Sequence, residues 1–189
     1  KKKLGNVNLI DYASSQVEGI IPKELKNNAS IVSIFGSSRN EYESIDGWEN
    51  DFLSGDDEEI IREICEKFKD IHFAYRAHPN LKLKKNTQTK NIEKLINIDN
   101  LFVFDSYSKI STYELINISD KIMVFGSTVG VEATFMKKPV ISLGPSIYDM
   151  LDISYKPKDL LELKNLLYDN NLQARSREDA IKYGYFQLT

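Results

Sequence analysis

Short runs of apolar residues recur along the chain, and between them apolar positions return with a helical period. The runs predict strands at 31–35, 71–75, 101–104, 121–125 and 139–143, with a last short strand near 153–155. The helical period predicts helices at 57–69, 90–97, 111–118, 129–136, 157–168 and 175–184, and a short one near 22–27. Strands and helices therefore alternate over most of the sequence.

This alternation predicts an α/β fold, a Rossmann-like parallel sheet with helices on both faces. Right-handed crossovers place the carboxyl ends of all strands at one edge, where such sheets bind ligands. We assign residues 31–189 to this domain and interpret residues 1–30, which are polar and irregular, as a linker or interlobe segment.

Unusual residues follow several of the predicted strands. They are Gly36-Ser37-Ser38, Arg76-Ala77-His78-Pro79, Gly126-Ser127-Thr128 and Gly144-Pro145-Ser146. Because the carboxyl ends of parallel strands meet at one edge, we expect these segments to converge on one crevice.

The segment 121–133 predicts a strand that passes through a glycine turn into a helix. Such a helix start presents unpaired N–H groups and partial positive charge, which suits a phosphate. Gly126 can adopt a backbone conformation closed to other residues, and Gly130 would leave room for a ligand. The alternative is an ordinary helix capped by Ser127 or Thr128.

His78 is one of two histidines, and Arg76 precedes it by two residues, so in an extended chain both can point the same way. Pro79 favours that extended backbone. The two side chains could neutralise a diphosphate or phosphodiester, and a nearby anion would favour the protonated imidazole. We therefore take His78 as the catalytic candidate, donating a hydrogen bond to a departing phosphate. The alternatives are a histidine that bonds a loop carbonyl and an arginine in a surface ion pair.

Glu132 lies in the second turn of the predicted helix, at a spacing that fits neither a capping box nor an i,i+4 salt bridge. It is therefore a candidate for binding ribose hydroxyls, with stabilisation of the helix dipole as the alternative. Ser37 and Ser38 could make a second phosphate or sugar contact, although turn chemistry explains them as well. Tyr148 and Trp48 could stack on a base, but core packing is commoner.

Composition narrows the function further. The 189 residues carry a formal net charge of −3, and no basic stripe dominates, which argues against nucleic acid as the main partner. A local basic cluster is interpreted as a solvated loop, with polyanion binding as the alternative; it consists of Lys82, Lys84, Lys85 and Lys90. One cysteine, Cys65, excludes an internal disulfide. Histidines and cysteines are too few for a zinc site, so we expect no metal.

No apolar run reaches membrane-spanning length and no signal-peptide core is visible. We therefore expect a cytoplasmic protein without a membrane span, located freely or at the inner face of the membrane. Because the first residue is lysine, we expect the chain to be part of a longer protein.

Several of these motifs together resemble a known family. His78-Pro79, Ser127-Thr128, Gly130, Glu132-Ala133 and Lys138-Pro139-Val140-Ile141 resemble the carboxyl-terminal lobe of GT-B-type glycosyltransferases, as does Phe35-Gly-Ser-Ser-Arg-Asn-Glu41 with Trp48. The resemblance covers roughly residues 31–168. It is greatest to bacterial capsular-polysaccharide and surface-glycan enzymes, including relatives of the Kdo transferases and bacterial sialyltransferases.

The resemblance implies that His78 and the Ser127-Thr128 turn contact the phosphate of a nucleotide-sugar donor, a CMP-sugar among the candidates. It implies that Glu132 holds the ribose and that residues 105–111 lie near the base. The partners implied are a glycan acceptor and an amino-terminal lobe of the same protein, which supplies the general base. No separate cofactor is expected. The alternatives are a sugar-nucleotide epimerase, a polyol-phosphate transferase, and a non-catalytic nucleotide-binding module.

Overall fold

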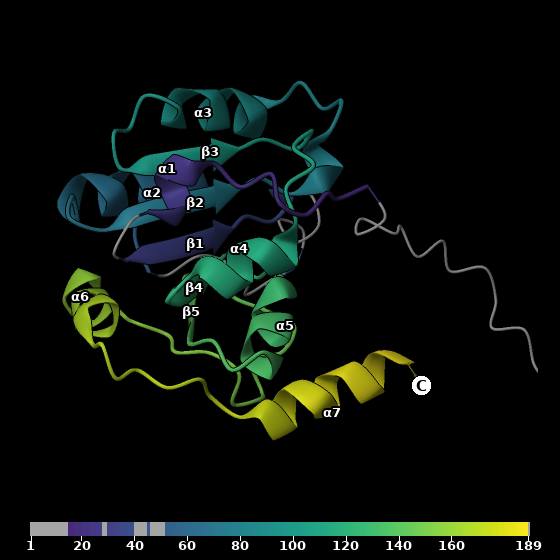
Figure 1. Cartoon of the computed structure of the whole chain (residues 1–189). Coiled ribbons are helices and arrows are strands. Elements are labelled where there is room, and N and C mark those ends of the chain that lie inside the picture. Colours follow the sequence, from purple (N-terminus) through teal and green to yellow (C-terminus); the bar gives the residue numbers. More distant parts are fainter. Residues whose placement is uncertain (1–14, 28–29, 40–44, 46–51, 189) are drawn as a thin grey trace, which may run out of the picture.

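The computed structural model describes residues 15–27, 30–39, 45 and 52–188. Its centre is a five-stranded sheet in the order β3-β2-β1-β4-β5, and every pairing is parallel (Figure 1). The strands are β1 (Ile31–Phe35), β2 (His72–Arg76), β3 (Leu101–Phe104), β4 (Lys121–Val124) and β5 (Val140–Ser142). The predicted Rossmann-like parallel sheet is confirmed.

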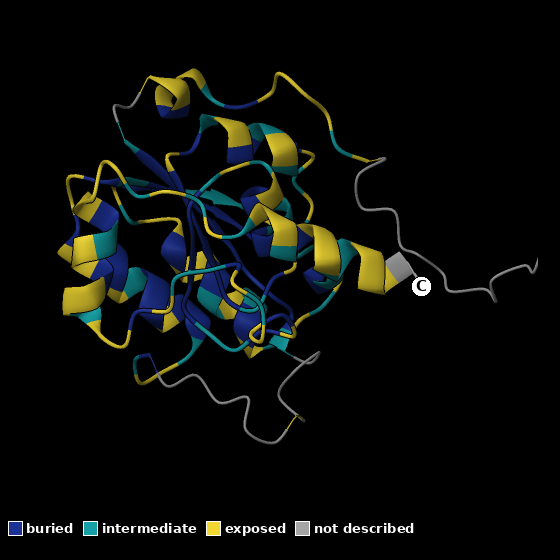
Figure 2. Cartoon of the chain, turned by 90° about the horizontal axis from the view of Figure 1, so that it is seen from below, coloured by how far each residue is buried: buried dark blue, intermediate teal, exposed yellow. Residues whose placement is uncertain are grey.

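Helices cover both faces of the sheet. One face carries α2 (Asp57–Lys67), α3 (Thr87–Leu95) and α6 (Leu160–Tyr168), and the other carries α1 (Lys23–Lys26), α4 (Thr112–Ile118) and α5 (Val129–Phe135). A last helix, α7 (Arg177–Leu188), packs beside α5, and a short 3-10 helix, η2 (Pro79–Leu81), follows β2. Figure 2 shows buried strands between helices with exposed outer faces, and the end of α7 projecting from the body.

Two apolar cores hold these layers together. On one side, Ile60 and Ile64 of α2 and Leu163 of α6 pack against the sheet. On the other side, Leu115 of α4 and Ala133 of α5 do so. A strand buried on both faces is apolar at nearly every position, which explains why the strands appear in the sequence as continuous apolar runs.

Part of the segment interpreted as a linker belongs to the packed domain. Leu25 is fully buried with Ile21 in the second core, and Val17 forms a parallel bridge with Ile110. Residues 15–27 therefore pack against the 31–189 domain, so this part of residues 1–30 is not a free linker.

Some element bounds differ from the prediction. Helix α3 begins at Thr87 rather than at residue 90, because Asn86 accepts from the Thr89 N–H and the Thr89 hydroxyl accepts from the Asn86 N–H. The strand predicted near 153–155 is a single bridge between Ile141 and Tyr155. In the described part of the chain, none of the helices combines the length and apolar character that crossing a membrane requires.

The strand order reverses at β1, which pairs with β2 on one side and with β4 on the other. The carboxyl ends of β1, β2 and β4 are therefore neighbours. In open α/β sheets, this reversal leaves a crevice outside the strand ends that serves as the ligand site.

Candidate functional site

A cleft of about 180 Å³ opens at the carboxyl ends of the central strands. Its walls come from the ends of β1 and β2, the start of α4 and the turn before α5. Six of the residues selected from the sequence line it together: Gly36, Arg76, His78, Ser127, Thr128 and Glu132. Three of the four predicted strand-end segments therefore contribute to this cleft, whereas Gly144-Pro145-Ser146 does not line it.

Arg76, the last residue of β2, is only 6% exposed. Its Nη1 atom has no hydrogen-bond partner, and no ion pair of the described residues includes it. The alternative of a surface ion pair is thus not what the structure contains. Burial lowers the pKa of the guanidinium, but the group stays charged at neutral pH. Among the residues that the structure describes, this buried cation therefore forms no ion pair with a carboxylate.

The imidazole of His78 is oriented by the backbone that follows it. Its Nδ1 accepts a hydrogen bond from the Asn80 N–H at 3.1 Å, at the start of η2. A nitrogen that accepts this bond cannot also carry a proton, so Nε2 is the ring nitrogen that can donate to a phosphate oxygen.

The turn before α5 presents backbone donors to the cleft. Thr128 makes no side-chain capping bond, and the Ser127 hydroxyl accepts only a long bond of 3.4 Å from the Val129 N–H. Within the described residues, no recorded hydrogen bond occupies the N–H groups of Ser127 and Thr128. The Ser127 hydroxyl therefore caps the helix only weakly, and the N–H groups of Ser127 and Thr128 remain for a ligand.

A buried tyrosine supports this turn from below. The Tyr148 hydroxyl donates to the Ser127 carbonyl at 2.8 Å, and a Cβ at Gly130 would lie 2.5 Å from that hydroxyl oxygen. Gly130 therefore makes room for Tyr148, not for a ligand as the sequence suggested. Tyr148 packs in the core, as the commoner alternative held, and Trp48 lies outside the described residues.

Gly126 gives the turn its shape. Its φ is +72°, and an added Cβ would lie 2.6 Å from the carbonyl oxygen of Pro145. Because both the conformation and a backbone atom oppose a side chain, we expect Gly126→Ala to lower the free energy of unfolding by about 2–4 kcal/mol. Urea denaturation measures the change.

Gly184 in α7 is the matched control, since an added Cβ there meets nothing within 4 Å. Gly184→Ala should raise the free energy of unfolding by about 0.5–1 kcal/mol. A Gly126→Ala protein as stable as the wild type would show that the turn does not need glycine.

A carboxylate and a phenol share another part of the cleft. Burial, followed by the hydrogen bond to the Glu132 carboxylate, raises the pKa of Tyr113. The sequence did not single out Tyr113, because it lies inside an ordinary helical pattern. Gln16, from the segment interpreted as a linker, accepts from the Thr112 N–H at 2.7 Å and also lines the cleft. No local signal in the sequence identifies it.

Ser37 and Ser38 do not line the cleft. The Ser37 hydroxyl donates to the Phe125 carbonyl at 2.5 Å, and the fully buried Ser38 hydroxyl accepts from the Lys84 ammonium at 3.1 Å. Both hydroxyls bond to residues that are distant in the chain, so local turn chemistry does not account for them. Gly126 likewise shapes the cleft from outside it.

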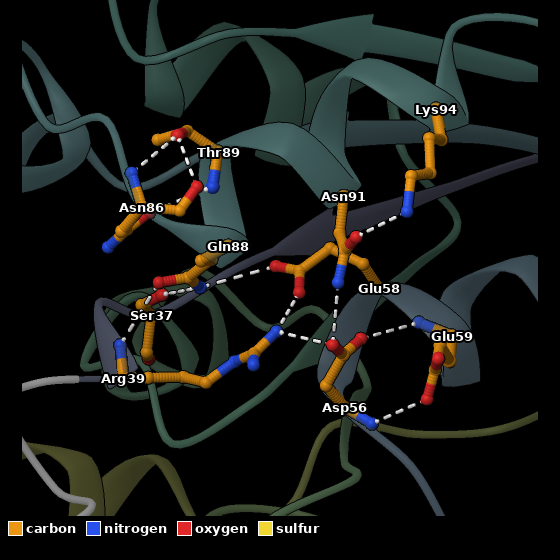
Figure 3. A network of polar contacts seen from close by, with 10 residues as sticks. All are labelled: Ser37, Arg39, Asp56, Glu58, Glu59, Asn86, Gln88, Thr89, Asn91 and Lys94. Carbon is orange, nitrogen blue, oxygen red and sulfur yellow. Dashed lines mark hydrogen bonds and ion pairs between the residues drawn. The ribbon is translucent and has the colours of Figure 1, made fainter.

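A buried polar network fixes the turn after β1 (Figure 3). Arg39 pairs with Glu58 and with Asp56, while the Gln88 amide donates to the Ser37 carbonyl at 3.0 Å and to Glu58 at 3.2 Å. Glu58 is 2% exposed, and burial raises its pKa to about 7 even though Arg39 opposes the shift. The network ties α2 and α3 to the rim of the site.

No group of three or more metal-binding side chains occurs among the described residues.

The sheet order and the cleft at its reversal are those of a Rossmann-like lobe. The family model of capsule polysaccharide biosynthesis proteins matches residues 55–180, about two thirds of the sequence. The chain therefore belongs to this family and has a role in capsule biosynthesis. A search of the curated proteins found no match to the sequence.

Similar solved structures include S. aureus MnaA in complex with UDP (14% identity, TM-score 0.54, 93% of this chain, 50% of that chain). The UDP-GlcNAc 2-epimerase of Neisseria meningitidis bound to UDP-GlcNAc is also similar (15% identity, TM-score 0.50, 84% of this chain, 44% of that chain). A third is the KpsC β-Kdo 2,7-transferase of Thermosulfurimonas dismutans (18% identity, TM-score 0.46, 84% of this chain, 55% of that chain). At these identities the likeness shows the fold alone. The chain spans about half the length of these proteins.

Proposed function

We propose that this chain is the donor-binding lobe of a capsule glycosyltransferase, and that its cleft holds the phosphates of a nucleotide-sugar. The observation that carries the proposal is Arg76, a cation buried in the cleft that forms no ion pair in the described part of the chain. A buried charge without a partner is costly, so the arrangement is explained when a ligand supplies the anion.

The surrounding donors suit a phosphate more than a single carboxylate. The N–H groups of Ser127 and Thr128 and the Nε2 proton of His78 add hydrogen-bond donors to the charge of Arg76 in the same cleft. Fixed donors of this kind stabilise the negative charge that develops on a departing phosphate. His78 is the candidate catalytic residue for that step, and Arg76 remains beside the charge throughout.

Other groups in the cleft fit the nucleoside. Glu132 accepts hydrogen bonds from hydroxyl groups, so we assign it to the ribose, with Tyr113 as its neighbour. Two proteins of similar fold were solved with UDP and with UDP-GlcNAc, which supports a nucleotide ligand here. Transfer to a glycan hydroxyl further requires a general base, which we assign to the amino-terminal lobe.

Calorimetric titration of the chain with CMP, CDP, UDP and GDP tests the proposal. We expect one nucleotide to bind selectively, and His78→Ala to lower its affinity about ten- to hundredfold, because a hydrogen bond to a charged phosphate is lost. His72, at the opposite end of β2, offers the matched control His72→Ala, which should bind like the wild type. No binding by the wild type, or equal binding by His78→Ala, would move the phosphate site elsewhere.

The epimerase alternative differs in its product. A transferase moves the sugar to an acceptor and releases the nucleotide, whereas an epimerase returns an altered sugar still linked to the nucleotide. Incubating the full-length protein with nucleotide-sugar and no acceptor separates the two. An altered nucleotide-sugar would favour the epimerase.

A further inference from the structure

A second cleft of about 540 Å³ lies beside the first, between α3, the loop before it and the end of β3. Its lining includes the apolar side chains of Leu81, Ile92 and Val103. Leu81 belongs to η2, and Pro79 of the same short helix lines the first cleft. The two clefts therefore share η2 as a wall.

Lysines dominate the charge of this second cleft. Lys84, Lys85 and Lys90 line it, and Lys82 lies at its rim above the Tyr107 ring, 5.3 Å from the centroid. None of these lysines takes part in an ion pair of the described residues. In a chain of net charge −3, this is a local excess of positive charge open to an anion.

Tyr107 supplies an aromatic surface beside these lysines. It is 53% exposed, and its hydroxyl accepts from the Leu83 N–H at 3.0 Å, so the loop that carries the lysines is held against the ring. Leu83 itself has a left-handed φ of +68°. The ring, the loop and the lysines thus form one built surface.

Glu93 and Asp105 also line the cleft, and neither forms an ion pair among the described residues. Carboxylates accept hydrogen bonds from hydroxyl groups but repel a continuous phosphate backbone. An aromatic ring, hydroxyl acceptors and unpaired ammonium groups together match a sugar that carries an acidic group.

We propose that the second cleft binds an acidic saccharide, with its sugar ring against Tyr107 and its carboxylate or phosphate groups on Lys85 and Lys90. Identifying this saccharide as the glycan acceptor rests on the proposed function, whereas the binding itself does not. The shared wall at η2 places the saccharide next to the cleft assigned to the donor. The polyanion role that the sequence left open for the lysines is thereby narrowed to a glycan.

The test is a calorimetric titration with a short oligogalacturonate, and with a neutral maltooligosaccharide of equal length. We expect only the acidic saccharide to bind, and added salt to weaken it. The double variant Lys85→Gln/Lys90→Gln should lose about tenfold in affinity. The matched control Lys158→Gln/Lys164→Gln changes the net charge equally at and just before α6, and should bind like the wild type.

Tyr107→Ala should lose about fivefold in affinity, whereas Tyr107→Phe, which retains the ring but not the hydrogen bond from the Leu83 N–H, should lose less. Nucleotide affinity should stay unchanged in the Lys85→Gln/Lys90→Gln variant. A wrong assignment of the saccharide site can therefore be told apart from a wrong assignment of the nucleotide site. Equal loss in both lysine double variants would overturn the proposal. So would binding to vesicles containing phosphatidylglycerol without binding to oligogalacturonate.

Discussion

Replacing Arg76 with methionine should lower the affinity for the preferred nucleoside diphosphate about 100-fold, close to 2.7 kcal/mol, and at the same time stabilise the fold by about 1–2 kcal/mol. The affinity falls because the ligand loses a charge-assisted contact inside a buried cleft. The fold gains because methionine removes a guanidinium that burial desolvates and no carboxylate compensates. Calorimetry and urea denaturation measure the two effects on the same protein.

The opposite signs separate a binding role from a structural one. Arg62→Met is the matched control, since Arg62 lies on the exposed side of α2, where it pairs loosely with Glu66. That variant should leave the nucleotide affinity unchanged. If Arg76→Met instead destabilised the protein and retained full affinity, Arg76 would be a structural residue.

Replacing Arg39 with methionine should destabilise the protein by about 3–5 kcal/mol at about pH 8. The change leaves the Glu58 carboxylate buried, with Gln88 as a hydrogen-bond partner and without a cation. Glu58→Gln should cost much less, because a neutral amide at that position needs no counter-ion. The double variant should resemble Glu58→Gln, and urea denaturation of the four proteins gives the coupling between the two residues.

The destabilisation by Arg39→Met should decrease as the pH falls. The Glu58 carboxyl has a pKa of about 7 in the fold, against its ordinary value of 4.5, so the folded state binds the proton more tightly. The stability that the protonated Glu58 carboxyl contributes is therefore lost as the pH rises from 4.5 through about 7. Arg39→Met removes the charge that opposes the shift, so the pKa rises further, and at about pH 5 the neutral carboxyl should cost little. A penalty independent of pH would show that Glu58 stays ionised.

The sequence indicated the sheet because its strands are buried on both faces. Apolar runs such as those at 31–35 and 122–125 sit between polar turns, and this pattern is local to the chain. The ends of the helices were harder to predict from the sequence. The start of α3 depends on the reciprocal bonds of Asn86 and Thr89, and α7 continues past Gly184.

Part of the candidate site could be predicted from the sequence for the same reason. Arg76 and His78 follow one strand and Ser127 another, and parallel strands bring those ends to one edge. Gln16 and Tyr113 were missed, because one lies in an irregular segment and the other within a regular helix.

By itself, the sequence determined the α/β architecture and three of the strand ends that form the crevice, since periodicity and glycine turns act over a few residues. Only the tertiary structure decided which polar groups are already satisfied, because their partners are distant in the chain. Ser37 bonds the Phe125 carbonyl, and Gly130 accommodates Tyr148. Arg76 meets no carboxylate at all among the described residues. That difference in hydrogen bonding and burial separates the residues that hold the turn from those that remain for a ligand.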